Sequence, residues 1–368
     1  MVHPGRNRAL AAIGLMSGTS LDGIDAAMLT TDGERVLEHG PAATYPYPEE
    51  FRERLRALLG REPDPGWRRV IEELTDRNAD AVARLLDSAG VPASTIDVVG
   101  FHGQTVWHRP ARRRTLQIGD GARLAAATGI GVVADFRTAD VAAGGEGAPL
   151  APLYHAGLAG ALQKPIAVLN IGGVANLTWI GESEREPNVL AFDTGPGTAL
   201  LDDWVLARTG RACDEDGRLA ATGRVDAGRV TGWLAHDFFR RMPPKSLDRD
   251  VFRFARDAVI GFSPADGAAT LAAFSARAVA FALPLLPAAP RRWLVCGGGR
   301  RNPVLMEMIR TGVGVPVEPV EAVGWRGDFL EAEAFAFLAV RSLRGLPLTL
   351  PTTTGTPRPL TGGRLHGP

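Results

Sequence analysis

The sequence predicts an α/β protein with two domains of similar plan that face each other across a cleft. Its 368 residues exceed the usual length of one domain. Each half starts with a strand, a glycine-rich turn and a second strand, at residues 10–30 and 165–181. Strands and helices alternate after each hairpin, which is typical of α/β domains. We therefore expect domains over residues 1–160 and 161–345 and a tail over 346–368.

The first half predicts a hairpin followed by helices and short strands. Residues 10–16 and 24–30 are the hairpin strands, because apolar runs flank the turn SGTSLDG and Asp32-Gly33 ends the second run. Thr75 interrupts the second of the predicted helices. The helices expected here are 51–59, 70–88 and 122–128, and the further strands are 96–101, 116–119 and 131–134.

The second half repeats this plan and ends in a helix and a tail. Residues 189–204 predict a strand, a turn and the start of a helix. A long apolar helix over 270–283 precedes a strand at 293–296. Asn302 and Pro303 then mark a helix start, as its cap and first residue. The last predicted helix is 329–341, and the tail is expected to extend over the surface.

Composition excludes several classes of protein. Lysine plus arginine and aspartate plus glutamate both number 41, which argues against a general nucleic-acid or acidic-membrane binder. Cys213 and Cys296 cannot form a disulfide framework and lack metal-ligand spacing, so a reducing cytoplasm fits. Residues 9–16 lack the cleavage site of a signal peptide. Arg277 and several prolines interrupt the apolar run 271–290, which favours a buried helix over a membrane span.

The first glycine-rich turn could bind the phosphate tail of a nucleotide. Glycines let backbone N–H groups converge into an anion site, and Ser17, Thr19 and Ser20 add hydroxyl donors. Asp22 and Asp25 would repel a bare phosphate but suit one that carries Mg²⁺. The alternative is an ordinary hairpin tip, since Gly and Asp are common in turns.

Two further turns have the same character. Gly172 and Gly173 lie between Asn170 and Asn176, and the run 297–299 lies between a buried strand and a capped helix. The latter could let a base or ribose pack close to the backbone. Neither turn has the spacing of a P-loop or of a dinucleotide fingerprint.

Asp193 is the strongest candidate for a catalytic side chain. It follows the apolar strand VLAF and precedes the turn TGPG. A carboxylate at the end of a strand in an α/β fold faces the usual ligand crevice. The alternative is that Asp193 caps the helix that follows.

Other polar residues follow predicted strands or occupy the last helix. His102 and Gln104 alternate, so they share one face of an extended segment, although a histidine satisfied within a loop is an equal alternative. Arg137 could bind a carboxylate or phosphate through two parallel hydrogen bonds. Of Glu331 and Glu333, one should face solvent while the other reaches the cleft.

A series of motifs, from about residue 11 to 363, carries a resemblance to a known family. They are MSGTSLDGIDAA, FHGQTVWH, QIGDGARLA, VVADFRTADVAAGGEGAPLAP, LNIGGVANLT, FDTGPGTALLDDW, PPKSLDRDVF, CGGGRRNPVLM and EAEAFAFLA. The chain resembles the anhydro-N-acetylmuramic acid kinases of the sugar kinase, Hsp70 and actin superfamily. MSGTSLDG and NIGGVANLT together are specific to this family.

The resemblance implies two actin-like, ribonuclease H-like ATPase domains with ATP and Mg²⁺ in the cleft between them. It implies that 1,6-anhydro-N-acetylmuramic acid, released in peptidoglycan recycling, becomes N-acetylmuramic acid 6-phosphate. It also suggests a homodimer, with no nucleic acid or membrane as partner. Asp193 matches the catalytic aspartate, and the segment 18–25 lies at the phosphates.

We therefore predict a site with four groups of residues. Asp193 and Glu331 are catalytic, and Asp22 and Asp25 are candidates to hold the metal. The sugar is expected at Ser17, His102, Gln104 and Arg137. The nucleotide is expected at Gly18, Thr19, Ser20, Leu21, Asp22, Gly23, Ile24, Asp25, Gly172, Gly173, Asn176, Gly297, Gly298 and Asn302.

The chain departs from the family pattern in a few places, and two other functions compete. Thr198 stands where Asn is usual, PPKSLDRD replaces PPKSTGRE, and Cys213 replaces an aromatic residue. These changes bear on sugar affinity and not on the class of reaction. One competing function is a kinase for a ring-open amino sugar, and the other is a nucleotide-gated binding or assembly module.

Overall fold

The computed structural model describes residues 8–18, 20–183 and 187–368, so Thr19 lies outside the described residues. The chain forms two compact units. The first unit is Met1–Gly160 with Phe329–Pro368, and the second unit is Ala161–Asp328. The second unit is therefore inserted into the first.

The first unit contains a mixed sheet with the order β13-β7-β4-β1-β2-β3. Strands β1, β2 and β3 are antiparallel neighbours, β4 and β7 continue parallel to β1, and β13 pairs antiparallel with β7. A separate antiparallel pair, β5–β6, follows β4. The strands are β1 Leu10–Met16, β2 Gly23–Thr31, β3 Val36–Pro46, β4 Val98–Phe101, β5 Gln104–Arg109, β6 Arg114–Ile118, β7 Val132–Ala134 and β13 Arg364–His366.

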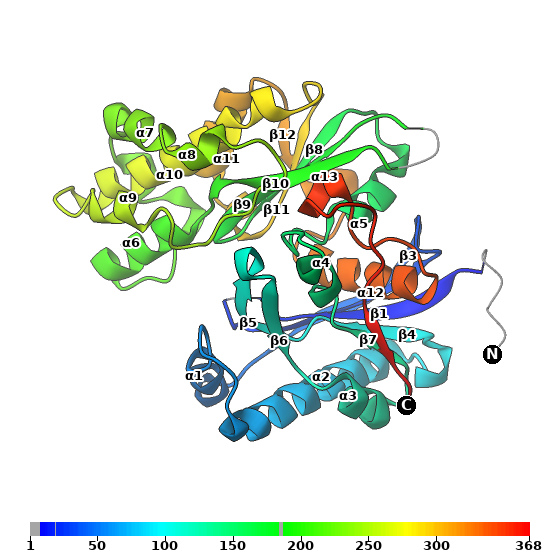
Figure 1. Ribbon diagram of the computed structural model, residues 1–368. Coiled ribbons are helices and arrows are strands. Elements are labelled where there is room, and N and C mark those ends of the chain that lie inside the picture. The colour runs from blue at the N-terminus through cyan, green and yellow to red at the C-terminus, as the bar shows by residue number, and fades with distance from the viewer. Residues whose placement is uncertain (1–7, 19, 184–186) are drawn as a thin grey trace. The chain divides into compact units, whose positions relative to one another are not determined.

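Helix α12 lies against one face of this sheet, with helices α2 and α3 on the other (Figure 1). The close approach of α12 depends on glycine at two paired positions, Gly14 on β1 and Gly100 on β4. A Cβ atom at Gly14 would lie 1.8 Å from the carbonyl oxygen of Ala332, and one at Gly100 would lie 2.1 Å from that of Phe335. The helices of this unit are α1 Glu49–Arg56, α2 Arg68–Ala89, α3 Gly121–Thr128, α4 Thr138–Ala142, α5 Pro152–Leu158, α12 Leu330–Leu343 and α13 Pro351–Thr354.

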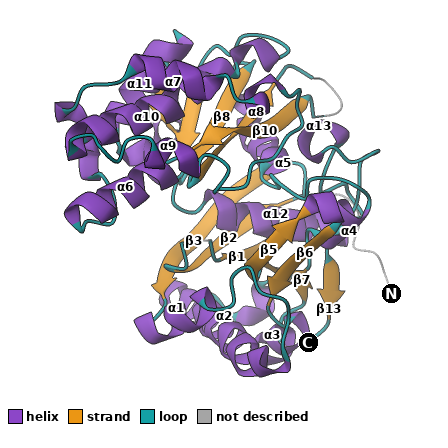
Figure 2. Ribbon diagram, turned by 60° about the vertical axis from the view of Figure 1, so that its left-hand side comes forward, coloured by secondary structure: helices purple, strands orange, loops and turns teal. Residues whose placement is uncertain are grey.

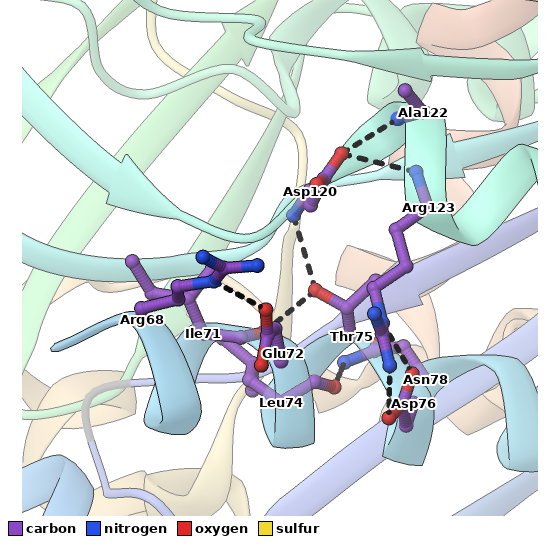
Figure 3. A network of polar contacts seen from close by, with 10 residues as sticks. All are labelled: Arg68, Ile71, Glu72, Leu74, Thr75, Asp76, Asn78, Asp120, Ala122 and Arg123. Carbon is purple, nitrogen blue, oxygen red and sulfur yellow. Dashed lines mark hydrogen bonds and ion pairs between the residues drawn. The ribbon is translucent and has the colours of Figure 1, made fainter.

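Alternation along the strands fills the opposite face with apolar side chains. Ile13 and Leu15 of β1 join a core with Leu85 of α2 and Leu124 of α3. Polar contacts fix α3 beside α2 (Figure 3). The backbone N–H of Asp120, the N-cap of α3, donates to Thr75, the residue that the sequence marks as an interruption of α2.

The second unit repeats the topology of the first. Its sheet has the order β10-β9-β8-β11-β12, in which β8, β9 and β10 are antiparallel neighbours and β11 and β12 continue parallel to β8. This is the order and direction of strands in a ribonuclease H-like domain. The predicted fold class, two similar actin-like α/β domains, is confirmed. The strands are β8 Ile166–Ile171, β9 Val174–Ile180, β10 Val189–Pro196, β11 Trp293–Cys296 and β12 Val317–Pro319.

Helices α6 to α10 come between β10 and β11 in the chain, and they gather beside the sheet of the second unit (Figure 2). Their aromatic core includes Trp204, Trp233, Phe252 and Phe274. Helix α10 is the one described helix that is long and apolar enough to cross a membrane, and most of its apolar window is buried in the fold, as predicted for a core helix. The helices are α6 Ala199–Thr209, α7 Ala227–Leu234, α8 Asp237–Arg240, α9 Arg253–Asp257, α10 Pro264–Phe281 and α11 Pro303–Val313.

Two sequence predictions need correction. The second domain does not extend to residue 345, because α12 packs on the sheet of the first unit and the division falls after Asp328. The tail is not simply extended: it forms the short helix α13, and β13 adds an edge strand beside β7.

Candidate active site

The sugar residues predicted in the first unit follow neighbouring parallel strands. Ser17 follows β1, His102 follows β4, and Arg137 comes shortly after β7. Because the carboxyl ends of parallel strands meet at one edge of a sheet, these side chains gather there. Ser17, His102 and Gln104 are buried at that edge.

Hydrogen bonds tie the first glycine-rich turn to β5. The Ser17 hydroxyl donates to Oε1 of Gln104 at 2.7 Å, and Nε2 of Gln104 donates to the Gly18 carbonyl at 3.3 Å. The Leu21 N–H donates to the same carbonyl, and Leu21 has a φ of +59°. These bonds hold Ser17, Gly18 and Leu21 in place, and a phosphate-binding loop requires such fixed groups.

The two aspartates proposed for the metal already contact neighbouring side chains. Asp22 is exposed and lies 3.2 Å from Nη2 of Arg52, and Asp25 accepts from the Thr44 hydroxyl at 2.5 Å. Among the described residues there is no group of three or more metal-ligating side chains. A phosphate-bound Mg²⁺ needs only one or two protein carboxylates, so the donor set at this turn is chemically suited to it.

Arg137 forms hydrogen bonds with His102. Nε and Nη2 of Arg137 lie 3.2 and 3.0 Å from Nε2 of His102, and Nη1 donates to the Gly147 carbonyl at 2.6 Å. A guanidinium can only donate, so Nε2 of His102 must carry the lone pair. Nδ1 then carries the proton and donates to the Gly103 carbonyl at 2.9 Å.

Burial keeps this histidine neutral. Desolvation, aided by the charge of Arg137, holds the pKa of His102 well below its usual range. Desolvation also lowers the pKa of Arg137 to about 10, against the opposing charges of Glu331 and Asp140, so Arg137 stays charged at neutral pH. His102 thus orients Arg137, which has further N–H donors beyond those used in these bonds.

Replacing His102 with asparagine and with glutamine should show whether His102 orients Arg137 or only fills space beside it. The amide oxygen of glutamine reaches the place of Nε2 and can accept from Arg137, whereas that of asparagine reaches only the place of Nδ1. We expect His102→Asn to raise the KM for the sugar about tenfold, the size of one lost hydrogen bond to a charge. His102→Gln should lie closer to wild type in a steady-state assay, and the KM for ATP should not change in either variant. Equal effects of the two substitutions would contradict an orienting role.

The two glutamates of α12 differ in burial, and one of them faces solvent, as expected. Glu331 is exposed, and its charge acts on Arg137. Glu333 is fully buried within the first unit, where it accepts from the Tyr154 hydroxyl and lies 3.0 Å from Nδ1 of His39. The one that faces solvent is therefore Glu331, the residue predicted to assist catalysis.

The second unit aligns its polar residues in one row across three strands. Asn170 on β8 pairs with Asn176 on β9, which pairs with Asp193 on β10. The residues next to them in the chain, Ile171 and Phe192, are buried in the core under the sheet. Alternation therefore directs all three polar side chains to the other face.

Asp193 does not cap a helix. Thr198 occupies the N-cap position of α6, and the Asp193 carboxylate instead accepts from the backbone N–H of Leu247 at 2.7 Å. The alternative of a capping role is therefore wrong. The strand also does not stop before Asp193, as the sequence predicted, because β10 continues to Pro196 and Asp193 lies within its C-terminal half.

The second and third glycine-rich turns are shaped by close contacts. The N–H groups of Gly197 and Thr198 donate to the carbonyls of Gly173 and Gly172. A Cβ atom at Gly297 would lie 2.3 Å from Oδ1 of Asn170, and Gly297 has a φ of +74°. The turn after β11 therefore lies directly beside the polar row.

Asn302 is confirmed as the cap of α11, with Pro303 at its first position. Its side chain accepts from the Leu305 N–H at 3.0 Å. A contact of Asn302 with a nucleotide remains a prediction, as does one of Gly298.

Sequence reasoning did not single out Lys245, which contacts Asp193. It is buried, and its backbone carbonyl accepts from the Asp193 N–H at 2.9 Å. The one feature of the sequence that could have indicated Lys245 is its place in the family motif PPKSLDRD. A loop that folds back on a strand has no periodicity by which it could be predicted.

Two ribonuclease H-like sheets, each with a glycine-rich hairpin at its strand ends, define the actin-like class of phosphotransferases and ATPases. The family described as anhydro-N-acetylmuramic acid kinase matches residues 10–367. A protein of that name from Rhodospirillum rubrum is 59% identical over 358 residues, which cover 96% of this chain and 94% of that protein. One from Acidiphilium cryptum is 59% identical over 364 residues, which cover 97% and 98%. The chain belongs to the anhydro-N-acetylmuramic acid kinase family and is a kinase that phosphorylates an alcohol group.

Among solved structures, the chain is similar to component A of (R)-2-hydroxyglutaryl-CoA dehydratase from Acidaminococcus fermentans. That similarity has a TM-score of 0.47 and 11% identity over 91% of this chain and 99% of that one.

Proposed function

We propose that the chain uses ATP to open 1,6-anhydro-N-acetylmuramic acid with water and to phosphorylate O6, which yields N-acetylmuramic acid 6-phosphate and ADP. The observation that carries this proposal is the position of Asp193 in the C-terminal half of β10, aligned with Asn176 and Asn170, in a member of this kinase family. The reaction belongs to peptidoglycan recycling and amino sugar catabolism.

One carboxylate suffices for this chemistry. The sugar has an internal acetal between C1 and O6, and its hydrolysis resembles that of an inverting glycosidase, which uses a base for water and an acid for the leaving oxygen. Here the leaving oxygen is also the phosphoryl acceptor. If the γ-phosphorus of ATP takes O6 as the C1–O6 bond breaks, no protein acid has to protonate O6.

Asp193 is the proposed base. It would remove a proton from the water that attacks C1, and the hydrogen bond from the Leu247 N–H holds the carboxylate in place for this step. Glu331 is the candidate to orient that water, and its exposure leaves it accessible to a ligand.

The turns are proposed to bind the nucleotide. In the first unit, Gly18, Ser20 and the segment up to Asp25 would hold phosphate oxygens, and in the second unit the tip at Gly172 would do so. The turn at Gly297 would let the base or ribose pack close to the backbone. Asp22 or Asp25 would hold Mg²⁺ through waters, and the ion supplies neutralisation of phosphate charge when it is bound.

The sugar is proposed to bind through Arg137, whose fixed guanidinium suits the carboxylate of the lactyl group. Ser17 and Gln104, already bonded to each other, would bind sugar hydroxyls or the N-acetyl group. A cytoplasmic location and a homodimer remain predictions from the sequence and the family resemblance.

The test is consumption of ATP by the purified protein with Mg²⁺ and one of four additions: the anhydro sugar, N-acetylmuramic acid, N-acetylglucosamine or no sugar. We expect turnover only with the anhydro sugar and a product that contains one oxygen from ¹⁸O-water at C1. Turnover with a ring-open sugar would make Asp193 an ordinary kinase base. No stimulation by any sugar would favour a nucleotide-gated module.

A further inference from the structure

Lys245 is a charged residue buried inside the second unit, in the loop between α8 and α9. Its side chain is 3% exposed. The ammonium group donates to the Phe238 carbonyl at 3.0 Å and lies over the rings of Phe238 and Phe192. Phe238 belongs to α8 and Phe192 immediately precedes Asp193 on β10, so Lys245 joins α8 to that strand.

The segment around Lys245 contacts Asp193 through both backbone and side chain. The Asp193 N–H donates to the Lys245 carbonyl at 2.9 Å, and the Leu247 N–H donates to Oδ2 of Asp193 at 2.7 Å. On its other side, the pairing of β10 with β9 is irregular between Asp193 and Gly195. The segment from Lys245 to Leu247 therefore holds Asp193 through two hydrogen bonds, next to the point where the ladder becomes irregular.

Stability alone does not account for an ammonium group at this place. Burial lowers the pKa of Lys245 from 10.5 to about 8; the charge of Arg241 adds to this effect and that of Asp193 opposes it. The folded protein therefore holds this proton less tightly than the unfolded chain, so the charged amine destabilises the fold below about pH 8. That penalty fades as the pH rises toward 10.5. A methionine would fill similar space without it.

We propose that Lys245 is a positioning residue for Asp193, an inference that rests on the proposed role of Asp193 as the base. The bond from Nζ to the Phe238 carbonyl anchors the loop, and the anchored loop directs the Leu247 N–H at the carboxylate. The charge of Lys245 also favours the ionised form of Asp193, the form that can take a proton from water. The charged groups that act on Lys245 are Arg241 and Asp193.

The experiment measures the steady-state kinetics of Lys245→Met between pH 5 and 9 together with its thermal unfolding. We expect kcat to fall about 100-fold, as for a misplaced catalytic group, with the KM values for ATP and sugar unchanged. The acidic limb of the kcat profile should move to higher pH, because Asp193 has lost a neighbouring positive charge. The melting temperature at pH 7 should not fall.

Chemical rescue tests the same inference with a second variant. Lys245→Cys in a Cys213→Ser background, which removes the exposed free thiol, is treated with 2-bromoethylamine to rebuild an amine of nearly the same length. We expect recovery of kcat and return of the acidic limb to its original pH. A parallel reaction on Cys213→Ser alone controls for modification of the buried Cys296.

Two results would overturn the inference while leaving the proposed function intact. One is a Lys245→Met enzyme with the kcat and acidic limb of wild type. The other is a loss of activity that follows a lower melting temperature and is not restored by the rebuilt amine. Normal turnover by Asp193→Asn would instead show that the proposed function of Asp193 is wrong.

Discussion

Asp193→Asn is expected to lower kcat about 10³- to 10⁴-fold, the upper range for loss of a general base. An amide has nearly the same shape as the carboxylate, but it cannot accept a proton from the attacking water. The KM for the sugar and the affinity for ATP should change little, because the contacts proposed for binding lie on other residues. Single-turnover kinetics measures the rate of the chemical step. Isothermal titration with a non-hydrolysable ATP analogue measures the affinity for the nucleotide.

The substitution needs a control for the removal of a negative charge from the second unit. Asp257 is an exposed residue of α9, and the Asp257→Asn variant should have the same kcat as wild type. Turnover by Asp193→Asn within about tenfold of wild type would exclude Asp193 as the base, since a positioned base contributes at least about 100-fold.

Gly14→Ala is expected to destabilise the first unit more than any single surface change. The added methyl group would lie 1.8 Å from the Ala332 carbonyl oxygen and 2.6 Å from the Ala336 nitrogen, both in the backbone of α12. The helix cannot relax by turning a side chain, so it must move off the sheet. We expect a loss of about 3 kcal/mol or more and a fall in melting temperature of about 10 °C.

The matched control is Gly160→Ala, where an added Cβ meets no atom within 4 Å. Denaturant unfolding followed by circular dichroism measures both variants. If Gly14→Ala unfolded at the same denaturant concentration as Gly160→Ala, α12 could not lie against β1 in the described way. Gly100→Ala should reproduce the effect of Gly14→Ala, because Gly100 is its partner on β4.

Local patterns predicted most of the elements of this fold. The strand at 293–296 and the start of α11 at Pro303 were placed correctly, because a buried apolar run and a capping residue are short-range signals. The strand β3 was not predicted, since its residues are only partly buried and lack clear alternation. The assignment of α12 to the first unit could not be predicted either, because it depends on a contact between residues more than three hundred positions apart, of which Gly14 gives no sign by itself.

In the candidate site, too, some residues could be predicted from the sequence and others could not. Glycines and polar residues near strand ends made Asp193, Gly297 and Ser17 candidates from sequence, because an α/β fold uses those ends for ligands. The sequence could not tell that His102 accepts from Arg137, since the tautomer of a histidine depends on its partners. It also could not reveal the contacts of Lys245 with Phe238 and Asp193, which depend on the path of a loop in space.

The insertion of the second unit into the first has a consequence for protein synthesis. The ribosome makes residues 161–328 before it makes α12 and β13, so the sequence of the second unit is complete while the sheet of the first still lacks a helix on one face and an edge strand. We expect the later part of the polypeptide to acquire its structure before the earlier part does. The sheet of the nascent first unit stays uncovered around Gly14 and Gly100 until α12 has been made.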